Sequence, residues 1–207
     1  MSTGQALTQV SQVAPAISRL SGGVTNFYLI EDGGKLTVVD AGTPADWALL
    51  QRALAARGKP AGDVEAVLLT HAHADHTGFA ERARTEAGAR VWVHRADAAV
   101  AKGAKPGTND GGMARYLLRA EFYRTTLSLM RRGGAKIVPV LEVSVFGDGE
   151  VLDVPGRPRV IHAPRSHARQ RGLVLRPAPG PVQRRHHKLM ASLPGTGEKA
   201  AHTAPAR

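Results

Sequence analysis

The chain contains no cysteine in its 207 residues. Disulfides, thiolate metal ligands and a cysteine nucleophile are therefore excluded. No Lys or Arg precedes Arg19 and no apolar segment occupies the N-terminus, so no signal peptide is visible. No apolar run approaches the roughly 20 residues that a membrane-spanning helix needs. Together with an ordinary apolar content of 43%, these absences predict a soluble, cytoplasmic protein without a membrane partner.

Acidic side chains are scarce in the last part of the chain, which makes the formal net charge of +11 uneven. Residues 165–207 hold nine Lys and Arg and one acid, Glu198, whereas residues 1–164 hold 19 basic and 16 acidic side chains. The basic segment also lacks aromatic residues, and a nucleic-acid surface is expected on a folded domain with readout elements beside it. We therefore interpret residues 165–207 as a basic low-complexity tail, and we expect no nucleic-acid partner.

Alternating strand-like and helix-like patterns predict one α/β layered domain over residues 13–164, after a flexible N-terminus over residues 1–12. The predicted elements are a hairpin over 26–42, helices over 44–58, 79–86 and 113–132, and strands over 64–70, 90–94, 136–146, 151–154 and 158–164. Residues 64–70 are continuously apolar, which is typical of a strand buried on both faces. In the last helix, Tyr116, Phe122 and Tyr123 could cover a substrate cleft or belong to the core.

The segment "THAHADHTG" follows this buried strand directly and places four metal-ligand residues within six positions. Residues two apart in an extended segment point the same way, so His71 and His73 can bind one ion at about 2.0 Å. Asp75 supplies a hard oxygen ligand, and His76 should face away from the pair, where it suits a second ion. Two ions about 3.5–4 Å apart can activate a water and polarise a substrate oxygen. The alternative, a polar turn with incidental histidines, does not account for this concentration.

The motif "HAHADH" resembles the HxHxDH signature of the metallo-β-lactamase superfamily, which includes glyoxalase II-type thioesterases, lactonases and phosphodiesterases. "VVDAG" resembles the strand of that family that ends in a supporting buried Asp, here Asp40. "VWVHRADA" resembles a strand whose His, here His94, is not a usual ligand. The resemblance implies an αββα sandwich with the metal site at one edge of its two sheets.

The resemblance also implies the ligand sets. His71 and His73 would bind the first zinc, and Asp75 and His76 would bind the second. Asp75 is also the candidate catalytic residue. Zinc is the family's usual metal, although His and Asp ligands also suit iron or manganese.

The family's later ligands are the part that this sequence does not match. Members carry "PGHTPGS", whose His completes the first site, then a "GD" whose Asp bridges the ions, then a far C-terminal His. Here Pro164 is followed by "RSHARQ". His162 matches an upstream histidine that does not ligate, and His167 lies one position beyond the expected ligand. No "GD" follows, so the sandwich is expected to be incomplete in its C-terminal half.

Reading the codons one base later can restore two of the three missing features, "PGHTPGS" and "GD". Residues 165–171 can be encoded so that the shifted frame spells "GHTPGS" directly after Pro164. The same shift permits "FSGDT" over residues 182–186, in the family's order and spacing. The hypothesis is that residues 165–207 are an out-of-frame translation, arising from a mutation or a sequencing error. The basic charge of the tail would then follow from shifted GC-rich codons.

These observations leave three interpretations of function. The first is a two-zinc hydrolase of a small-molecule ester, thioester, lactone or related bond, in which water activated by the metal attacks. The second is a catalytically impaired remnant of such an enzyme, with His167 as a possible substitute ligand. The third, nucleic-acid binding through the tail, lacks any readout motif.

Overall fold

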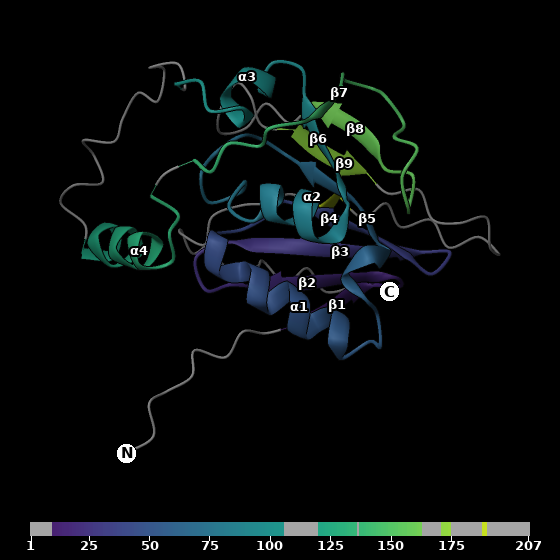
Figure 1. The fold of residues 1–207 in the computed structure, drawn as a ribbon, viewed down its shortest axis with the longest axis horizontal. Helices are drawn as coiled ribbons and strands as arrows, with labels where there is room; N and C mark the ends of the chain where they lie inside the picture. Colours follow the sequence, from purple (N-terminus) through teal and green to yellow (C-terminus); the bar gives the residue numbers. More distant parts are fainter. Residues whose placement is uncertain (1–9, 106–119, 136, 163–170, 175–187, 190–207) are drawn as a thin grey trace, which may run out of the picture.

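A computed structural model describes residues 10–105, 120–135, 137–162, 171–174 and 188–189 (Figure 1). Within these residues the larger sheet has seven strands in sequential order from β1 to β7. Its strands are β1 (Val10–Ala14), β2 (Ile17–Ser21), β3 (Asn26–Asp32), β4 (Lys35–Val39), β5 (Val64–Leu69), β6 (Arg90–His94) and β7 (Ser144–Phe146). Strands β1 to β4 pair antiparallel, whereas β4 to β7 pair parallel.

The parallel half of this sheet determines where a site can form. Because β4, β5, β6 and β7 run in the same direction, their carboxyl ends meet at one edge of the sheet. The loop that follows β4 begins with Asp40, the histidine-rich loop follows β5, and His94 ends β6. Ligand sites of open sheets with parallel strands gather at this carboxyl edge. Residues far apart in sequence are therefore brought together here.

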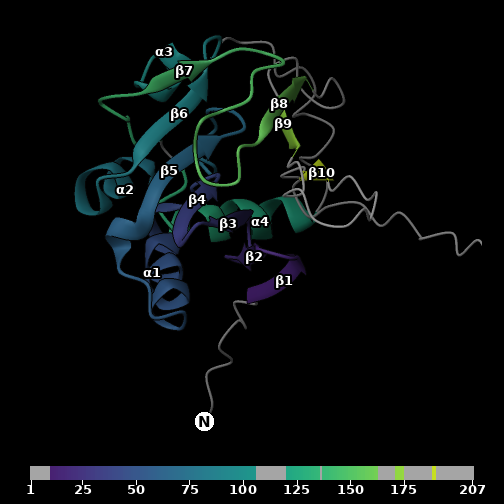
Figure 2. The ribbon, with the colours of Figure 1, turned by 90° about the vertical axis from the view of Figure 1, so that its right-hand side faces the viewer.

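One face of the larger sheet is covered by helices α1 (Trp47–Ala55) and α2 (Ala80–Ala87), as Figure 2 shows. Their buried faces contact alternate residues of the strands, as the two-residue period of a strand requires. Trp47 and Phe79 anchor this layer, with their ring centroids 5.8 Å apart, and Phe27 of β3 packs edge-on against Phe79. This is the larger of the two apolar cores.

The opposite face of the sheet carries the second core. Ile30, Leu68 and Phe146 point to this side and pack with Leu152 and Val160. Val160 belongs to a smaller sheet of three described strands, β8 (Arg159–His162), β9 (Arg171–Val174) and β10 (Lys188–Leu189). Figure 2 shows this sheet on the side away from α1 and α2. The expected αββα sandwich, incomplete in its C-terminal half, is thus confirmed: the described residues form one helix layer, the larger sheet and a partial second sheet, and no second outer helix layer is seen among them.

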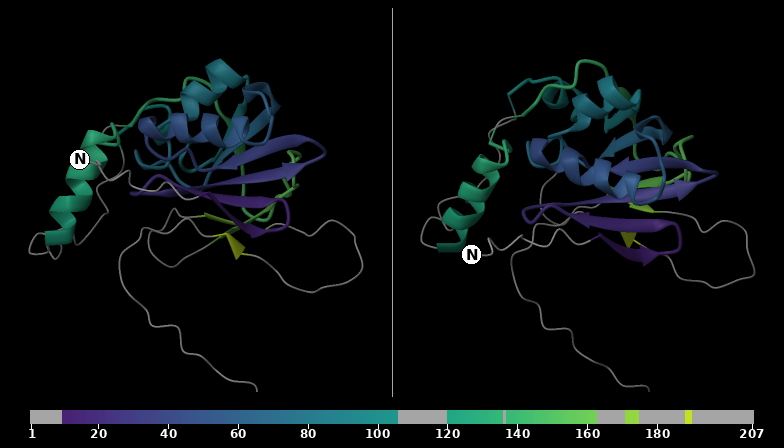
Figure 3. Two further views of the ribbon diagram at one scale, coloured as in Figure 1. Left: turned by 90° about the horizontal axis from the view of Figure 1, so that it is seen from below. Right: turned by 60° about the horizontal axis from the view of Figure 1, so that its bottom comes forward.

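Two further helices lie in the connection between β6 and β7. Helix α3 (Ala98–Ala101) follows β6 closely, and α4 (Ala120–Arg131) stands beside the body of the molecule near one end of the sheets (Figures 1 and 3). Two short 3-10 turns, Pro44–Asp46 and Ala61–Asp63, precede α1 and β5.

Most predicted elements are present, with shifts at their ends. The helix expected over 44–58 is α1, which starts later because Pro44–Asp46 forms a 3-10 turn. The strand expected over 136–146 is reduced to β7, and the non-strand part includes Pro139, which has no N–H to donate to a ladder. Residues 151–154 contribute only the isolated bridge Val151↔Arg159. Strand β1 includes residues 10–12, which the sequence pattern placed in the flexible N-terminus. The predicted helical residues 113–119 lie outside the described residues.

Candidate metal centre

The histidine-rich loop after β5 is held against the loop after β4 by backbone hydrogen bonds. The N–H of Ala41 donates to the carbonyl of His76 at 2.7 Å, and the N–H of Gly78 donates to the carbonyl of Gly42 at 2.9 Å. Phe79 adds a third bond, from its N–H to the carbonyl of Ala41 at 3.0 Å. The two loops that the sequence singles out, "VVDAG" and "THAHADHTG", therefore form one unit.

Gly78 makes this close approach possible. A Cβ at this position would lie 2.5 Å from the carbonyl oxygen of Gly42 and 2.5 Å from the nitrogen of Pro44. Both are backbone atoms that cannot move aside without breaking the contact between the loops. The glycine that ends "THAHADHTG" thus allows the backbones of the loops after β4 and β5 to pack in direct contact.

The three histidine rings of the motif lie together. The ring centroids of His71 and His73 are 4.5 Å apart, as expected for side chains two residues apart in an extended segment. The expectation that His76 faces away is wrong, because its ring centroid lies 4.2 Å from that of His71. The reason is a turn over residues 74–76, in which the N–H of His76 bonds to the carbonyl of His73 at 2.9 Å. This turn folds the chain back and returns His76 to the cluster.

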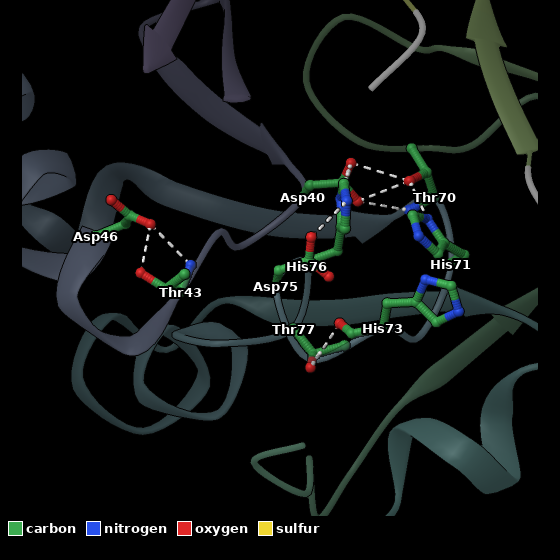
Figure 4. A network of polar contacts seen from close by, with 9 residues as sticks. All are labelled: Asp40, Thr43, Asp46, Thr70, His71, His73, Asp75, His76 and Thr77. Carbon is green, nitrogen blue, oxygen red and sulfur yellow. Dashed lines mark hydrogen bonds and ion pairs between the residues drawn. The ribbon is translucent and has the colours of Figure 1, made fainter. Parts of the chain in front are cut away.

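Asp40 is the buried polar centre behind these rings, as Figure 4 shows. Its φ of 62° lies in the left-handed region, which is unusual for a residue other than glycine and directs the carboxylate toward β5. Oδ1 accepts the Thr70 N–H at 2.8 Å, and the Thr70 hydroxyl lies 2.9 Å from both carboxylate oxygens. An ionised carboxylate only accepts, so the hydroxyl donates to Asp40.

This assignment fixes the tautomer of His71. Its Nδ1 lies 3.0 Å from the Thr70 hydroxyl oxygen, whose single proton is already given to Asp40. Nδ1 must therefore carry the proton and donate it to that oxygen, which leaves Nε2 with a lone pair. A metal-binding histidine commonly donates its other ring N–H in this way, and such a contact sets both ring orientation and basicity.

His76 is oriented by the same carboxylate. Its Nδ1 lies 3.0 Å from Asp40 Oδ2, although the contact is not aligned as an ideal hydrogen bond. Its Nε2 faces Asp75, with Oδ2 at 3.6 Å. Burial of the ring lowers the pKa of His76. The negative charge of Asp40, the contact of the ring with Asp40 and the charge of Asp75 together outweigh burial, so the pKa of His76 is raised. The two carboxylates on either side of this buried imidazole create a negative electrostatic potential, which favours the binding of a cation.

These distances test whether the residues fit a metal. Two ligands of one tetrahedral ion, each about 2.0–2.2 Å from it, lie about 3.3–3.6 Å apart. The separation of 3.6 Å between His76 Nε2 and Asp75 Oδ2 agrees with this value. The ring of His71 lies beside that of His73, with their centroids 4.5 Å apart. The spacing of His76 and Asp75 therefore fits two ligands of one ion, but nowhere in the described ranges are three His, Cys, Asp or Glu side chains placed to share one ion.

The other histidines considered from the sequence lie elsewhere. His94 is buried at the end of β6, where its Nδ1 accepts the Ala96 N–H at 3.2 Å and its Nε2 lies 3.8 Å from Asp148. The backbone of His162 belongs to β8. His167 and the positions where the later ligands were sought lie outside the described residues.

Sequence reasoning missed two contributors to the site. Thr70 was assigned only to the end of a strand, yet it links Asp40 to His71. Asp46 accepts the N–H and the hydroxyl of Thr43 at 2.8 and 2.7 Å and also binds the Arg132 guanidinium, so it fixes the loop after β4 (Figure 4). The available signals were a hydroxyl residue directly before the first histidine and an Asp three residues after a Thr.

The fold is that of an αββα domain with a histidine-rich loop at the carboxyl edge of its parallel strands. The model of the metallo-beta-lactamase superfamily matches residues 20–169, so the chain belongs to that superfamily. The match ends close to Pro164, where the sequence pattern changes.

Several solved structures share the fold. A metallo-β-lactamase from Cronobacter sakazakii is 21% identical, with a TM-score of 0.60 over 80% of this chain and 57% of that one. BJP-1, a subclass B3 metallo-β-lactamase of Bradyrhizobium japonicum, is 17% identical, with a TM-score of 0.59 over 82% of this chain and 58% of that one. The uncharacterized protein YobT of Bacillus subtilis is 34% identical over 79 residues, which are 38% of this chain and 33% of YobT. The chain thus spans little more than half the length of these structures and a third of YobT.

Proposed function

We propose that the chain is built as a metal-dependent hydrolase with a two-ion centre, zinc in the first instance and iron or manganese as alternatives. The proposed ligands are His71, His73, Asp75 and His76. The substrate is a small molecule with an ester, thioester, lactone or related bond. Membership of the superfamily supports the hydrolase class. The observation that carries the proposal is the convergence of three imidazoles and two carboxylates, with Asp40 orienting His76 directly and His71 through Thr70.

The chain's own residues prepare this centre in the following way. Asp40 and Thr70 hold Nδ1 of His71 protonated, so the lone pair that would bind a metal is on its Nε2. Asp75 is the candidate catalytic residue because its carboxylate is partly exposed beside His76 and can accept a hydrogen bond from a water. Bound at these residues, metal ions would supply Lewis acidity and would lower the pKa of a water to about 7.

Metal content tests the ligand assignment. Protein saturated with zinc and passed through a desalting column should retain about two ions per chain by elemental analysis. His73→Asn and His76→Asn should each lose about one ion, whereas His94→Asn serves as a matched control at the same sheet edge and should lose none. Retention of both ions in His73→Asn and His76→Asn would contradict the assignment. Hydrolysis assays with a panel of thioesters, lactones and esters then identify the class of bond that the protein cleaves.

A second candidate is a catalytically impaired remnant of such an enzyme. It is favoured because no three His, Cys, Asp or Glu side chains among the described residues are placed to hold one ion. A loop displaced by one residue, such as the one that carries His167, rarely meets the geometry that a metal demands. This candidate predicts weak or absent zinc retention and no hydrolysis, with both restored in a variant that continues in the shifted frame after Pro164.

The nucleotide sequence over codons 160–190 tests the frame hypothesis without any protein. The hypothesis expects the codons after Pro164, read one base later, to encode "GHTPGS". Any other shifted sequence would rule it out and would leave the present tail as the genuine continuation of the domain.

A further inference from the structure

Helix α4 stands beside the body and is anchored at its C-terminal end. The guanidinium of Arg132, one residue after the helix, binds the buried carboxylate of Asp46. The N–H of Ala45 donates to the carbonyl of Arg132 at 3.4 Å, and Gly134 is buried. Figures 1 and 3 show that the helix stands past the end of the sheets rather than across a sheet face. Much of its surface therefore faces away from the domain.

The outward surface of α4 is apolar along one stripe. Tyr123, Leu127 and Met130 are 58%, 49% and 58% exposed. Spacings of four and three residues place them on one face of a helix. Of the two roles considered from the sequence for Tyr123, core packing is therefore wrong. Three large exposed apolar side chains on one helix face make a patch that marks an interaction surface.

Positive charge accompanies this stripe. Arg124 and Arg131 are both exposed and follow Tyr123 and Met130 by one residue, so they flank the same side of the stripe. Within α4, Arg124 and Arg131 stand against one acid, Glu121, so the helix has a formal net charge of +1. An apolar stripe with a basic flank is the pattern of a helix that lies in the interface of an anionic membrane.

The geometry points to α4 as an interfacial helix, and we propose that it docks this protein on an anionic lipid surface. The apolar stripe would enter the boundary between headgroups and acyl chains, while Arg124 and Arg131 would contact the headgroups. Charge decides in favour of this partner over an apolar protein groove. Leu141 is more exposed, at 73%, but its neighbour Glu142 is acidic and its segment carries no basic flank.

The proposal concerns a helix that lies on a membrane and does not span it. Within the part of the chain that the structure describes, no helix is long and apolar enough to cross a bilayer. It is also independent of the metal centre, since none of the proposed metal ligands belongs to α4. Loss of metal and loss of lipid binding can therefore be measured separately.

The absence of cysteine allows a direct test on the full chain. Leu127→Cys is labelled with an environment-sensitive fluorophore and mixed with phosphatidylglycerol vesicles or with phosphatidylcholine vesicles. Thr125→Cys is the control on an exposed position of the same helix, and Leu141→Cys is the control on the body. The emission should rise and shift to the blue only for the label at residue 127, and only with anionic vesicles.

The basic tail could also attract anionic vesicles. Variants of α4 therefore distinguish binding through the helix from binding through the tail. Replacing both Arg124 and Arg131 by Gln should weaken partitioning roughly fivefold per charge, about 25-fold together. The double variant Leu127→Ser, Met130→Ser keeps every charge, and it should weaken partitioning into the vesicles about tenfold per replaced residue. Vesicle binding without a change in emission at residue 127, or binding unaffected by these variants, would assign attachment to the tail and overturn the proposal. Failure to bind either vesicle would also overturn it.

Discussion

Asp40 Oδ2 lies 3.0 Å from Nδ1 of His76, and the same carboxylate accepts the hydroxyl proton of Thr70, which contacts His71. One buried side chain thus orients two candidate ligands that belong to different halves of the proposed centre. The arrangement depends on the parallel pairing of β4 with β5, because Asp40 follows one strand and Thr70 follows the other. An aspartate outside the proposed ligand set is therefore expected to govern metal affinity.

Asp40→Asn should lower zinc affinity by about 10–100-fold, the usual effect of removing a partner that orients a metal-binding histidine. The amide keeps the shape of the side chain but removes its charge and presents a donor to one of its partners. Competition with a chromophoric chelator measures the affinity. Asp63→Asn is the matched control, since Asp63 pairs with Lys35 at 3.1 Å and precedes β5, at the end of that strand away from Thr70. Equal affinities in the wild type and in Asp40→Asn would contradict the orienting role.

The hydroxyl of Thr70 should stabilise the fold as well as orient His71. Thr70→Val keeps the shape of the side chain but leaves Nδ1 of His71 without its acceptor, at an expected cost of about 1–3 kcal/mol in the free energy of unfolding. Thr70→Ser keeps the hydroxyl and should lose much less. Urea denaturation measures the stabilities, and nitrogen NMR of the His71 ring reports the tautomer. A valine variant with an unchanged tautomer would show that another group sets it.

The sequence predicted the motif and the layers, because both depend on local patterns. A hydrophobic run such as residues 64–70 shows its burial directly, and "HAHADH" concentrates its ligands in one loop. The predicted orientation of His76 was wrong because the turn over residues 74–76 interrupts the two-residue period of an extended chain. Thr70 was also missed, since its role exists only when β4 and β5 lie side by side. Contacts between distant segments leave little trace in a single sequence.

The approach of the two site loops at Gly78 leads to a prediction on stability. Gly78→Ala places a Cβ 2.5 Å from backbone atoms of Gly42 and Pro44, so the loops must separate. We expect a loss of about 1–3 kcal/mol or more in the free energy of unfolding, together with weaker zinc binding. Gly62→Ala is the control, because no atom lies within 4 Å of a Cβ at that position. Similar stabilities for the two variants would argue against a close approach.

Glu81 should make part of the stability depend on pH. The Arg84 guanidinium donates to its carboxylate, which lowers the pKa of Glu81; burial opposes this effect, and the Leu141 N–H and the charge of Arg84 add to it. Because the folded pKa is below the unfolded value, the contribution is fully present above the ordinary glutamate pKa of 4.5 and is lost as the pH falls through the folded pKa. Carbon NMR of the Glu81 carboxyl measures the titration directly.

The stability of Glu81→Gln tests the same link between α2 and the segment before β7. The amide cannot form the ion pair with Arg84, so the variant should be less stable than the wild type at pH 7, and the difference should shrink as the pH falls below 4.5. Glu86→Gln is the control on the same helix, because Glu86 pairs with Arg82 on the surface and makes no contact with Leu141 in the described structure. A stability difference that is constant between pH 7 and pH 3 would show that the carboxylate of Glu81 does not link the two segments.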